Sequence, residues 1–547
     1  MRHLLKKILI ISVLAMVSAC QSPLEKVDLI IRNAVIYTLD EGFTMAQSAA
    51  IRDGVFVAVG TDKDIGAAYT ATETMNMNGA FVYPGLIDPH AHFFGYGTSL
   101  MNPDLSGSRS FEEIIDLIKD HHERFSGEWI LGRGWDQNLW PVQEFPHRSQ
   151  LDAVFPDIPV LLVRVDGHAA IANTEALNRA GITANTRVPG GEVALRNGAP
   201  TGILIDNAIG LVRGLVPPLT RQQEIQALLN AQQNCFAVGL TSVSDAGLGR
   251  STIELMDSLH QAGELQMRVY AMLSPTTENL ETFMFHGPYK TDHLNVRSLK
   301  LFADGALGSR GAKLLEPYSD DPGNSGLLVE TPEYLAEMSR KAFDCGYQVN
   351  THCIGDSAVR LMLHIYGELL EGDNDRRWRI EHAQIIHPED FDLFGKYQIV
   401  PSIQALHATS DMLWAVDRLG AERLKGGYAY QQLLKQNGWL PNGSDFPVEP
   451  INPLLGFYAA VERKNFDGIP PEGFQMENAL TRRQALRAMT IWAAKSQFEE
   501  DEKGSIEEGK FADFVVTSQD LMTMPAAEIN TLPIDMTFVG GNLVYSR

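Results

Sequence analysis

The sequence of 547 residues is poor in cysteine and in positive charge, and both shortages limit what the protein can be. Only four cysteines are present, and Cys235, Cys345 and Cys353 have no paired spacing, so a disulfide framework is not expected. Cys353 follows His352 directly, and we expect it to be a small buried side chain rather than a nucleophile. The chain has 45 Lys and Arg against 68 Asp and Glu, a formal charge of −23. This acidity argues against a nucleic-acid partner.

Long hydrophobic runs are also missing, except near the N-terminus. Basic residues precede an apolar run at 8–17, which is too short to span a bilayer comfortably. The run leads into VSAC, ending at Cys20, which resembles the lipobox of bacterial lipoproteins; a plain secretory signal is the alternative. We therefore expect residues 1–20 to be a lipoprotein signal peptide and Cys20 to carry a lipid anchor, in the cell envelope of a bacterium and facing the periplasm. Gln21-Ser22 lacks an acidic inner-membrane retention residue, which favours the outer membrane.

Both ends of the chain are predicted to be rich in β-strands. Alternating apolar residues and the turn pair Asp53-Gly54 indicate hairpins between residues 27 and 82. The C-terminus has the same character, in KFADFVV and in MTFVGGNLVY. The two ends, 24–83 plus 504–547, are therefore expected to form one small split β-sandwich.

The middle of the chain is predicted to be an α/β barrel. Eight short apolar runs end in polar residues, and helical patterns such as 222–238, 332–345, 357–370 and 481–495 separate several of them. The eight runs are 81–88, 240–245, 267–273, 298–304, 348–352, 378–382, 399–404 and 439–445. This order favours a parallel (β/α)8 (TIM) barrel over 84–99 plus 234–503, with its active site where the strands end. Residues 100–233 are too long for one crossover and are expected to form an insertion over the barrel mouth.

Candidate metal ligands lie where these runs end. His90 and His92, in PGLIDPHAH, are two residues apart, so both side chains can reach one cation from one face of an extended segment. Other strand ends supply His352 in VNTHCIGD, His382 in RIEHAQ and Asp445 in NGSDFPV. An HxH pair alone is weak evidence, but four histidines and an aspartate at one barrel mouth predict a metal site.

These motifs resemble the amidohydrolase superfamily. Together with LVRVDGHAAIAN and LKLFADGALGSRGAKL, they resemble the subgroup that contains the N-substituted formamide deformylases, from about residue 27 to the C-terminus. The resemblance implies a metal-dependent hydrolase with a centre of two divalent ions, usually zinc.

Lys300 determines how many metals are expected. From the sequence alone, a lysine in SLKLFAD could extend its amine to solvent or pair with Asp304. The resemblance instead implies that Lys300 is carboxylated by CO2 and bridges two metals. That reaction needs an uncharged amine, whose pKa is ordinarily about 10.4, and burial beside cations would lower this pKa.

The resemblance also implies a division of the ligands and a mechanism. One metal would be held by His90, His92, Lys300 and Asp445, and the other by Lys300, His352 and His382. By this resemblance, a water bridging the two cations would lose its proton near neutral pH and attack the scissile carbonyl. Asp445 would be the catalytic residue that accepts this proton and passes it to the leaving amine.

Three further residues are candidates for binding a small-molecule substrate. His168, in DGH, could stabilise an oxyanion or contact substrate. Trp135, with Asp136 and Trp140, could line the pocket, although buried tryptophans usually belong to a core. Arg310, in GSRG, could bind an acidic group, or it could form a salt bridge within its loop.

Three functions remain open from the sequence. The favoured one is hydrolysis of a C–N bond in an amide, N-formyl or N-acyl compound. A mononuclear deaminase of an aminated heterocycle would use similar histidines but would not need a bridging Lys300. A non-catalytic binding lipoprotein would have no need of an open metal site.

Overall fold

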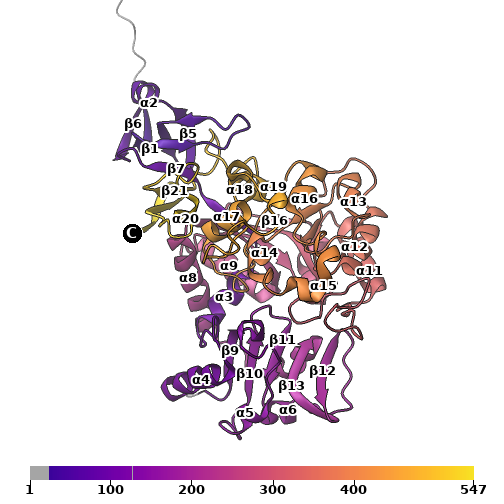
Figure 1. The fold of residues 1–547 in the computed structure, drawn as a ribbon. Helices are drawn as coiled ribbons and strands as arrows, with labels where there is room; N and C mark the ends of the chain where they lie inside the picture. The colour runs from indigo at the N-terminus through magenta and orange to yellow at the C-terminus, as the bar shows by residue number, and fades with distance from the viewer. Residues whose placement is uncertain (1–23, 126) are drawn as a thin grey trace, which may run out of the picture.

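The computed structural model describes residues 24–125 and 127–547 and divides them into three parts (Figure 1). A β-rich part stands at the top of the view, the barrel lies in the middle, and a second β-rich part lies below. The predicted signal peptide and Cys20 lie outside the described residues. In the described part of the chain, no helix is long and apolar enough to cross a membrane.

The upper part is a sandwich of two sheets, with strand orders β5-β4-β1-β6 and β23-β22-β21-β7-β2-β3. The strands are β1 (Glu25–Arg32), β2 (Val35–Tyr37), β3 (Met45–Ala46), β4 (Ser48–Arg52), β5 (Val55–Gly60), β6 (Tyr69–Asn76), β7 (Phe81–Pro84), β21 (Phe514–Thr517), β22 (Met536–Val539) and β23 (Asn542–Ser546). β21 pairs antiparallel with β7, which joins the two ends of the chain in one sheet. Ile31, Phe56 and Phe514 belong to the core that the two sheets share. The predicted sandwich built from both chain ends is confirmed.

Seven parallel strands and one irregular segment form the barrel. The strands, in the order of their pairing, are β8 (Leu86–Ala91), β14 (Leu240–Leu248), β15 (Arg268–Leu273), β17 (Leu294–Phe302), β18 (Gln348–Cys353), β19 (Arg379–His382) and β20 (Val400–Ser402). Residues 440–445 occupy the eighth position: Asn442 bridges Ile403 in parallel, and the Asp445 N–H donates to the His90 carbonyl at 2.8 Å. A (β/α)8 barrel is therefore confirmed.

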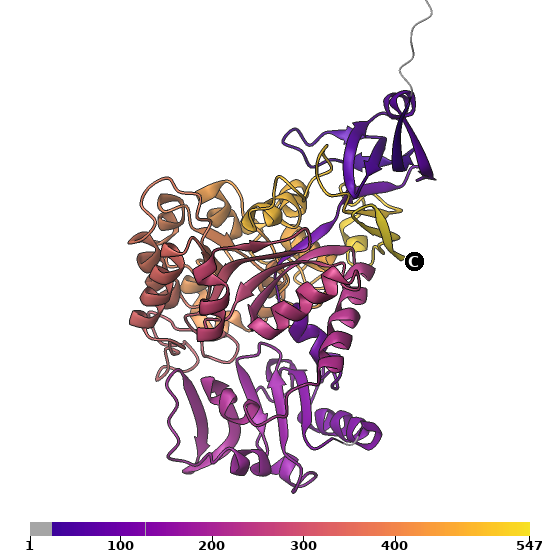
Figure 2. The ribbon, with the colours of Figure 1, turned by 180° about the vertical axis from the view of Figure 1, so that it is seen from behind.

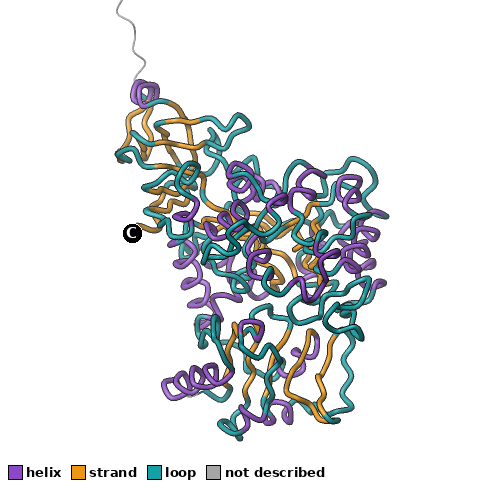
Figure 3. Tube along the Cα trace, viewed as in Figure 1, coloured by secondary structure: helices purple, strands orange, loops and turns teal. Residues whose placement is uncertain are grey.

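Helices surround this barrel, as the rear view and the tube show (Figures 2 and 3). The helices that follow its strands include α3 (Phe93–Ser99), α8 (Arg221–Ala237), α9 (Arg250–Gln261), α11 (Pro332–Asp344), α12 (Asp356–Gly367), α13 (Phe391–Lys396), α14 (Ala405–Asp411), α16 (Tyr430–Asn437), α17 (Pro453–Glu462), α18 (Arg482–Ala488) and α19 (Ile491–Ser496). Their starts follow local chemistry. Thr220 and Gln223 form a capping box on α8, and Thr331 caps α11, whose first residue is Pro332.

Three predicted elements differ in the structure. The run 81–88 is divided between β7 of the sandwich and β8 of the barrel at Gly85, where a Cβ would lie only 2.2 Å from Thr241 Oγ1. The run 439–445 forms one isolated bridge, between Asn442 and Ile403, but no regular strand. The predicted helix 481–495 is broken into α18 and α19 because Thr490 has a non-helical backbone (φ −139°, ψ −102°).

The lower part is the insertion, a five-stranded sheet in the order β12-β13-β11-β10-β9 with helices beside it (Figure 1). Its elements are α4 (Phe111–Phe125), β9 (Ile130–Trp135), α5 (Ser149–Asp152), β10 (Val160–Arg164), β11 (Ala169–Ala172), α6 (Thr174–Arg179), β12 (Gly191–Arg196), β13 (Ala199–Asp206) and α7 (Asn207–Arg213). It meets the barrel where the strands end: the His168 ring is 4.7 Å from the ring of His352.

Candidate active site

The two histidines of the HxH motif lie at the end of β8 and face Asp445. His90 is fully buried, and its Nε2 lies 3.5 Å from Asp445 Oδ1. His92 is partly exposed, and its Nε2 lies 3.2 Å from the same oxygen. The backbone fixes this approach, because the His92 N–H donates to the Phe446 carbonyl at 2.8 Å. Residues 355 positions apart in the chain thus meet as a unit.

His352 on β18 and His382 at the end of β19 complete the cluster. His382 ends β19 with a positive φ of 71°, and its ring centre is 4.9 Å from that of His90 and 4.5 Å from that of His352. Asp445 also has a positive φ, of 64°. Such conformations cost energy in non-glycine residues and concentrate at functional sites. Four histidines and Asp445 therefore converge as the sequence motifs predicted.

Three of these histidines, His90, His352 and His382, are held in their neutral form. Burial and the neighbouring Lys300 lower the pKa of His90 to about 4. Burial is also the main cause that lowers the pKa values of His352 and His382 well below their ordinary value. Neutral imidazole is the form that binds a metal.

Hydrogen bonds on the outer ring nitrogens assign the inner lone pairs. His90 Nδ1 donates to Glu381 Oε2 at 2.5 Å, and His382 Nδ1 donates to Gln404 Oε1 at 2.7 Å. His92 Nδ1 faces the Ala246 carbonyl at 3.2 Å, an acceptor. The Nε2 atom of each of these histidines therefore carries a lone pair. The Nε2 atoms of His90 and His92 both face the anionic Oδ1 of Asp445. Acceptors facing acceptors at this distance repel unless a cation lies between them, so the residues present fit a divalent metal.

Lys300, on β17, lies inside this cluster. It is 1% exposed, and its Nζ is 3.2 Å from His90 Nε2. The Asp304 carboxylate is already occupied by the backbone N–H groups of Lys313, Ile354 and Gly355, and does not pair with Lys300. Burial is the main cause that lowers the pKa of Lys300 to about 8. Its amine is thus more easily deprotonated than a lysine in water.

His407, on α14, is a residue of the site that the sequence motifs did not reveal. Its Nε2 lies 3.6 Å from Asp445 Oδ2, and its Nδ1 lies 3.0 Å from Glu449 Oε1. Among the residues that the structure describes, two groups have ligand atoms close enough to share an ion: His90, His92 and Asp445, and His382, His407 and Asp445. The second group contains His407 where the predicted set has His352 and Lys300. Burial would lower the pKa of His407, but Asp445 and Glu449 raise it to about 10, and an imidazolium offers no lone pair to a metal.

His168 approaches the cluster from the insertion. Its Nδ1 donates to Asp206 Oδ1 at 2.6 Å, and its ring lies against His352. Burial alone would lower the pKa of His168, but the Asp206 carboxylate raises it above the ordinary value. Asp206 holds a positive φ of 48° at the end of β13. His168 is therefore a proton donor at the mouth of the site.

The other two predicted substrate-binding residues are placed differently. Trp135 is fully buried in the core of the insertion, where its Nε1–H donates to the Leu162 carbonyl, so it cannot line the pocket. Arg310 forms a salt bridge with Asp320 at 2.8 Å, which is the alternative that its loop allowed. Both differences arise from partners that lie outside the local motif.

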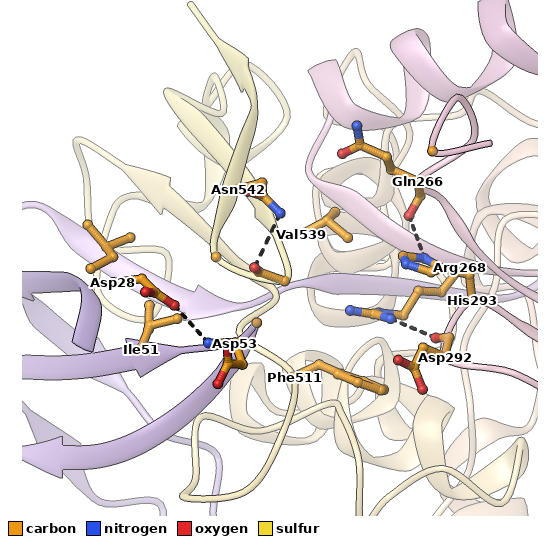
Figure 4. Close-up of a pocket in the computed structure, with 15 residues that line it drawn as sticks. Asp28, Ile51, Asp53, Gln266, Arg268, Asp292, His293, Phe511, Val539 and Asn542 are labelled. Carbon is orange, nitrogen blue, oxygen red and sulfur yellow. Dashed lines mark hydrogen bonds between the residues drawn. The ribbon is translucent and has the colours of Figure 1, made fainter. Parts of the chain in front are cut away.

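Two cavities clarify where a substrate can bind. A cavity of about 430 Å³ is lined by His168 and Asp206 of the insertion and by Leu301 and Phe302 of β17, and the ring of His168 also contacts His352 of the cluster. A cavity of about 650 Å³ lies at the junction of sandwich and barrel (Figure 4). There Arg268 is already paired with Asp513 and stacked on Phe511, so this cavity is not part of the site.

The fold and the site together define a class: a metal-dependent enzyme built on a (β/α)8 barrel. The chain belongs to the amidohydrolase family, which matches residues 73–545. It is 33% identical to YtcJ of Bacillus subtilis (strain 168) over 526 residues, covering 94% of this chain and 98% of that protein. It is 26% identical to the N-substituted formamide deformylase of Arthrobacter pascens over 554 residues, covering 95% of this chain and 98% of that protein.

A solved structure supports the same assignment. The chain superposes with a TM-score of 0.74 and 28% identity on an uncharacterized metal-dependent hydrolase from Pyrococcus horikoshii OT3, covering 91% of this chain and 99% of that one.

Proposed function

We propose that the protein hydrolyses a C–N bond of an amide, N-formyl or N-acyl small molecule at a centre of two divalent cations, zinc in the first instance. The observation that carries the proposal is the convergence of buried histidine lone pairs on Asp445 beside a buried lysine. The similarity to an N-substituted formamide deformylase over 95% of the chain supports the choice of bond.

Lys300 is proposed to carry a carboxylate in the active protein. Its neutral amine attacks CO2, an N–C bond forms, and one proton is released to water, leaving an N-carboxylate anion with two oxygens. Burial and a pKa of about 8 favour the neutral amine that this step needs. The new anion would replace an ammonium, which repels metal cations, with a group that can bind them. Lys300 would then hold both cations, one with His90, His92 and Asp445, the other with His352 and His382.

The residues around the centre have distinct roles. Bound cations would polarise the scissile carbonyl and lower the pKa of an attacking water. Asp445, whose pKa His407 holds well below its usual range despite burial, accepts the proton of that water. Passing the proton to the amine nitrogen completes the cleavage. His168 donates a hydrogen bond to the carbonyl oxygen as negative charge develops there.

The supporting residues keep this geometry. Glu381 and Gln404 fix the Nδ1–H tautomers of His90 and His382. Glu449 holds His407 against Asp445. Such outer partners orient ligands and raise their basicity.

The proposal is tested with purified protein and a panel of N-formyl, N-acyl and primary amide substrates, with aminated heterocycles as the opposing class. Release of an amine from an amide, lost on chelation and restored by zinc, is expected. His382→Ala should abolish it, whereas the exposed Glu389→Gln should not change it. Ammonia release from a heterocycle, with no amide cleaved, would instead identify a deaminase.

We further propose that the mature chain is attached to the cell envelope through lipid on Cys20, with this site facing the periplasm and a small-molecule substrate rather than a nucleic acid. The VSAC motif before Gln21 supports the anchor. The outer membrane is favoured by the absence of an acidic residue after Cys20.

A further inference from the structure

One arginine of the insertion lines the cavity next to His168, and a second lies beside a residue that lines it. Arg133 is on β9, and Arg213 ends α7 and lines the cavity directly. The same cavity is bordered by Gly167 and by the barrel residues Leu301 and Phe302. Arg213 and His168 therefore border one cavity, and the Arg133 guanidinium lies next to Gly167, which lines the same cavity.

Arg133 is held in place without an acidic partner. Its Nη2 donates to the Val165 carbonyl at 3.0 Å, and its Nε is buried with no hydrogen-bond acceptor. Gly167 makes room for it: the nearest guanidinium nitrogen would be only 3.3 Å from a Cβ at that position, which has a φ of +77°. Within residues 24–125 and 127–547, no carboxylate oxygen lies within 4.0 Å of a nitrogen of Arg133 or of Arg213.

Other arginines near the barrel mouth, unlike Arg133 and Arg213, are paired with carboxylates. Arg164 is paired with both Asp136 and Asp166, and Arg310 and Arg418 share Asp320. Acidic residues are thus supplied for other cations near the mouth. The N–H donors of Arg133 and Arg213 are not paired with carboxylates in the same way.

The charges around Arg133 point in the same direction. Burial lowers its pKa, Asp445 raises it and Arg213 lowers it, so both the catalytic carboxylate and the second arginine act on it. Two partly desolvated cations near each other repel, and an anion bound between them would relieve that repulsion. The Arg213 side chain is exposed, and desolvation by the protein around it lowers its pKa.

We propose that Arg133 and Arg213 bind a carboxylate group of the substrate beside the hydrolytic centre, so that the preferred substrates are N-acyl or N-formyl amino acids rather than neutral amides. The inference rests on the proposed function and adds the substrate class. A planar guanidinium matches a carboxylate with two parallel hydrogen bonds, and the α-carboxylate of an N-acyl amino acid lies close to the scissile nitrogen.

The test compares N-formylalanine with N-formylethylamine, which lacks only the carboxylate, on the metal-loaded full chain. Wild-type protein should favour N-formylalanine, and Arg133→Gln should lower kcat/KM for it by about 10- to 100-fold while changing that for N-formylethylamine by less than about 3-fold. Arg213→Gln, at an exposed side chain, should act in the same direction. The exposed Arg196→Gln removes one positive charge from the same insertion and should change neither rate. An unchanged preference in Arg133→Gln and Arg213→Gln overturns the inference.

A binding measurement separates this inference from the proposed function. Succinate binding to the same metal-loaded proteins is measured by calorimetry. If neither formamide is hydrolysed but succinate binds the wild type at least 10-fold more tightly than both arginine variants, the anion site stands and the proposed function fails. If formamides are hydrolysed and succinate binds all proteins equally, the anion site fails and the proposed function stands.

Discussion

Glu381→Gln should destabilise the protein and weaken its metal site more than its isosteric shape suggests. Glu381 is fully buried, accepts a hydrogen bond from His90 Nδ1 at 2.5 Å, and forms an ion pair with Arg379 at 2.6 Å. Burial raises the pKa of Glu381, but Arg379 and His90 lower it by more than burial raises it. The net result is a pKa of about 2, against the ordinary 4.5. One pKa unit corresponds to about 1.4 kcal/mol. Relative to the unfolded chain, the folded protein therefore favours the ionised form of Glu381 over its protonated form by about 3 kcal/mol.

The sign follows from the lowered pKa. The stabilisation from Glu381 is fully present above pH 4.5, its value in the unfolded chain, and is lost as the pH falls through about 2. The variant should therefore lose the full amount, about 3 kcal/mol, at pH 7 and equally at pH 5.5. It leaves the Arg379 cation buried and unpaired, which adds to the loss.

The assay is urea unfolding of metal-free protein, followed by tryptophan fluorescence, together with zinc titration of the folded state. Zinc affinity should fall about 10- to 100-fold, because an amide NH2 in place of Glu381 Oε2 cannot accept the proton of His90 Nδ1 and no longer fixes the His90 tautomer. Glu389→Gln is the matched control, since that side chain is 80% exposed and lies 3.8 Å from Arg360. A loss under about 1 kcal/mol with unchanged zinc affinity would refute the role given to Glu381.

Four further predictions concern the site and the anchor. Lys300→Ala should lose most activity and regain part of it with short carboxylates, whereas Lys300→Arg should stay inactive because a guanidinium cannot become a carbamate; an arginine variant as active as the wild type contradicts the bridging role. Labelling of metal-free protein by ¹³C-bicarbonate, read by carbamate NMR, should increase as the pH rises through about 8, the pKa of Lys300, and a signal that falls over this range is the opposing result. Asp206→Asn should lower the pKa of His168, measured by NMR, because the carboxylate that raises it is gone; an unchanged value would remove Asp206 from that role. Cys20→Ala should abolish lipid labelling and release the protein from the membrane fraction, and equal retention of both proteins would exclude the anchor.

Much of the fold could be predicted because its signals are local. Alternating apolar residues marked the sandwich strands, and the runs ending at His352 and His382 matched β18 and β19 closely. The divided first strand was not visible, because Gly85 matters only through its contact with Thr241 in a distant strand. The break at Thr490 likewise has no marker in the helical pattern.

In the site too, residues marked by a local motif could be predicted, whereas roles that depend on distant partners could not. His90, His92 and Asp445 follow strand ends and could be recognised from their motifs. His407 lies in the helix after β20, and its role depends on Glu449, 42 residues away. Trp135 and Arg310 were plausible pocket residues until their partners, Leu162 and Asp320, were located. A sequence motif therefore identifies a reactive group more reliably than it shows whether that group is already occupied.

The metal content of the protein, purified without chelators, tests the two-metal centre most directly. Elemental analysis of the wild type, with His90→Ala and Lys300→Ala beside it, gives the ratio of divalent metal to chain. The convergence of His90, His92, Lys300, His352, His382 and Asp445 predicts a ratio near two in the wild type, falling in both variants. A ratio near one that Lys300→Ala leaves unchanged would contradict a lysine-bridged pair and indicate a mononuclear site.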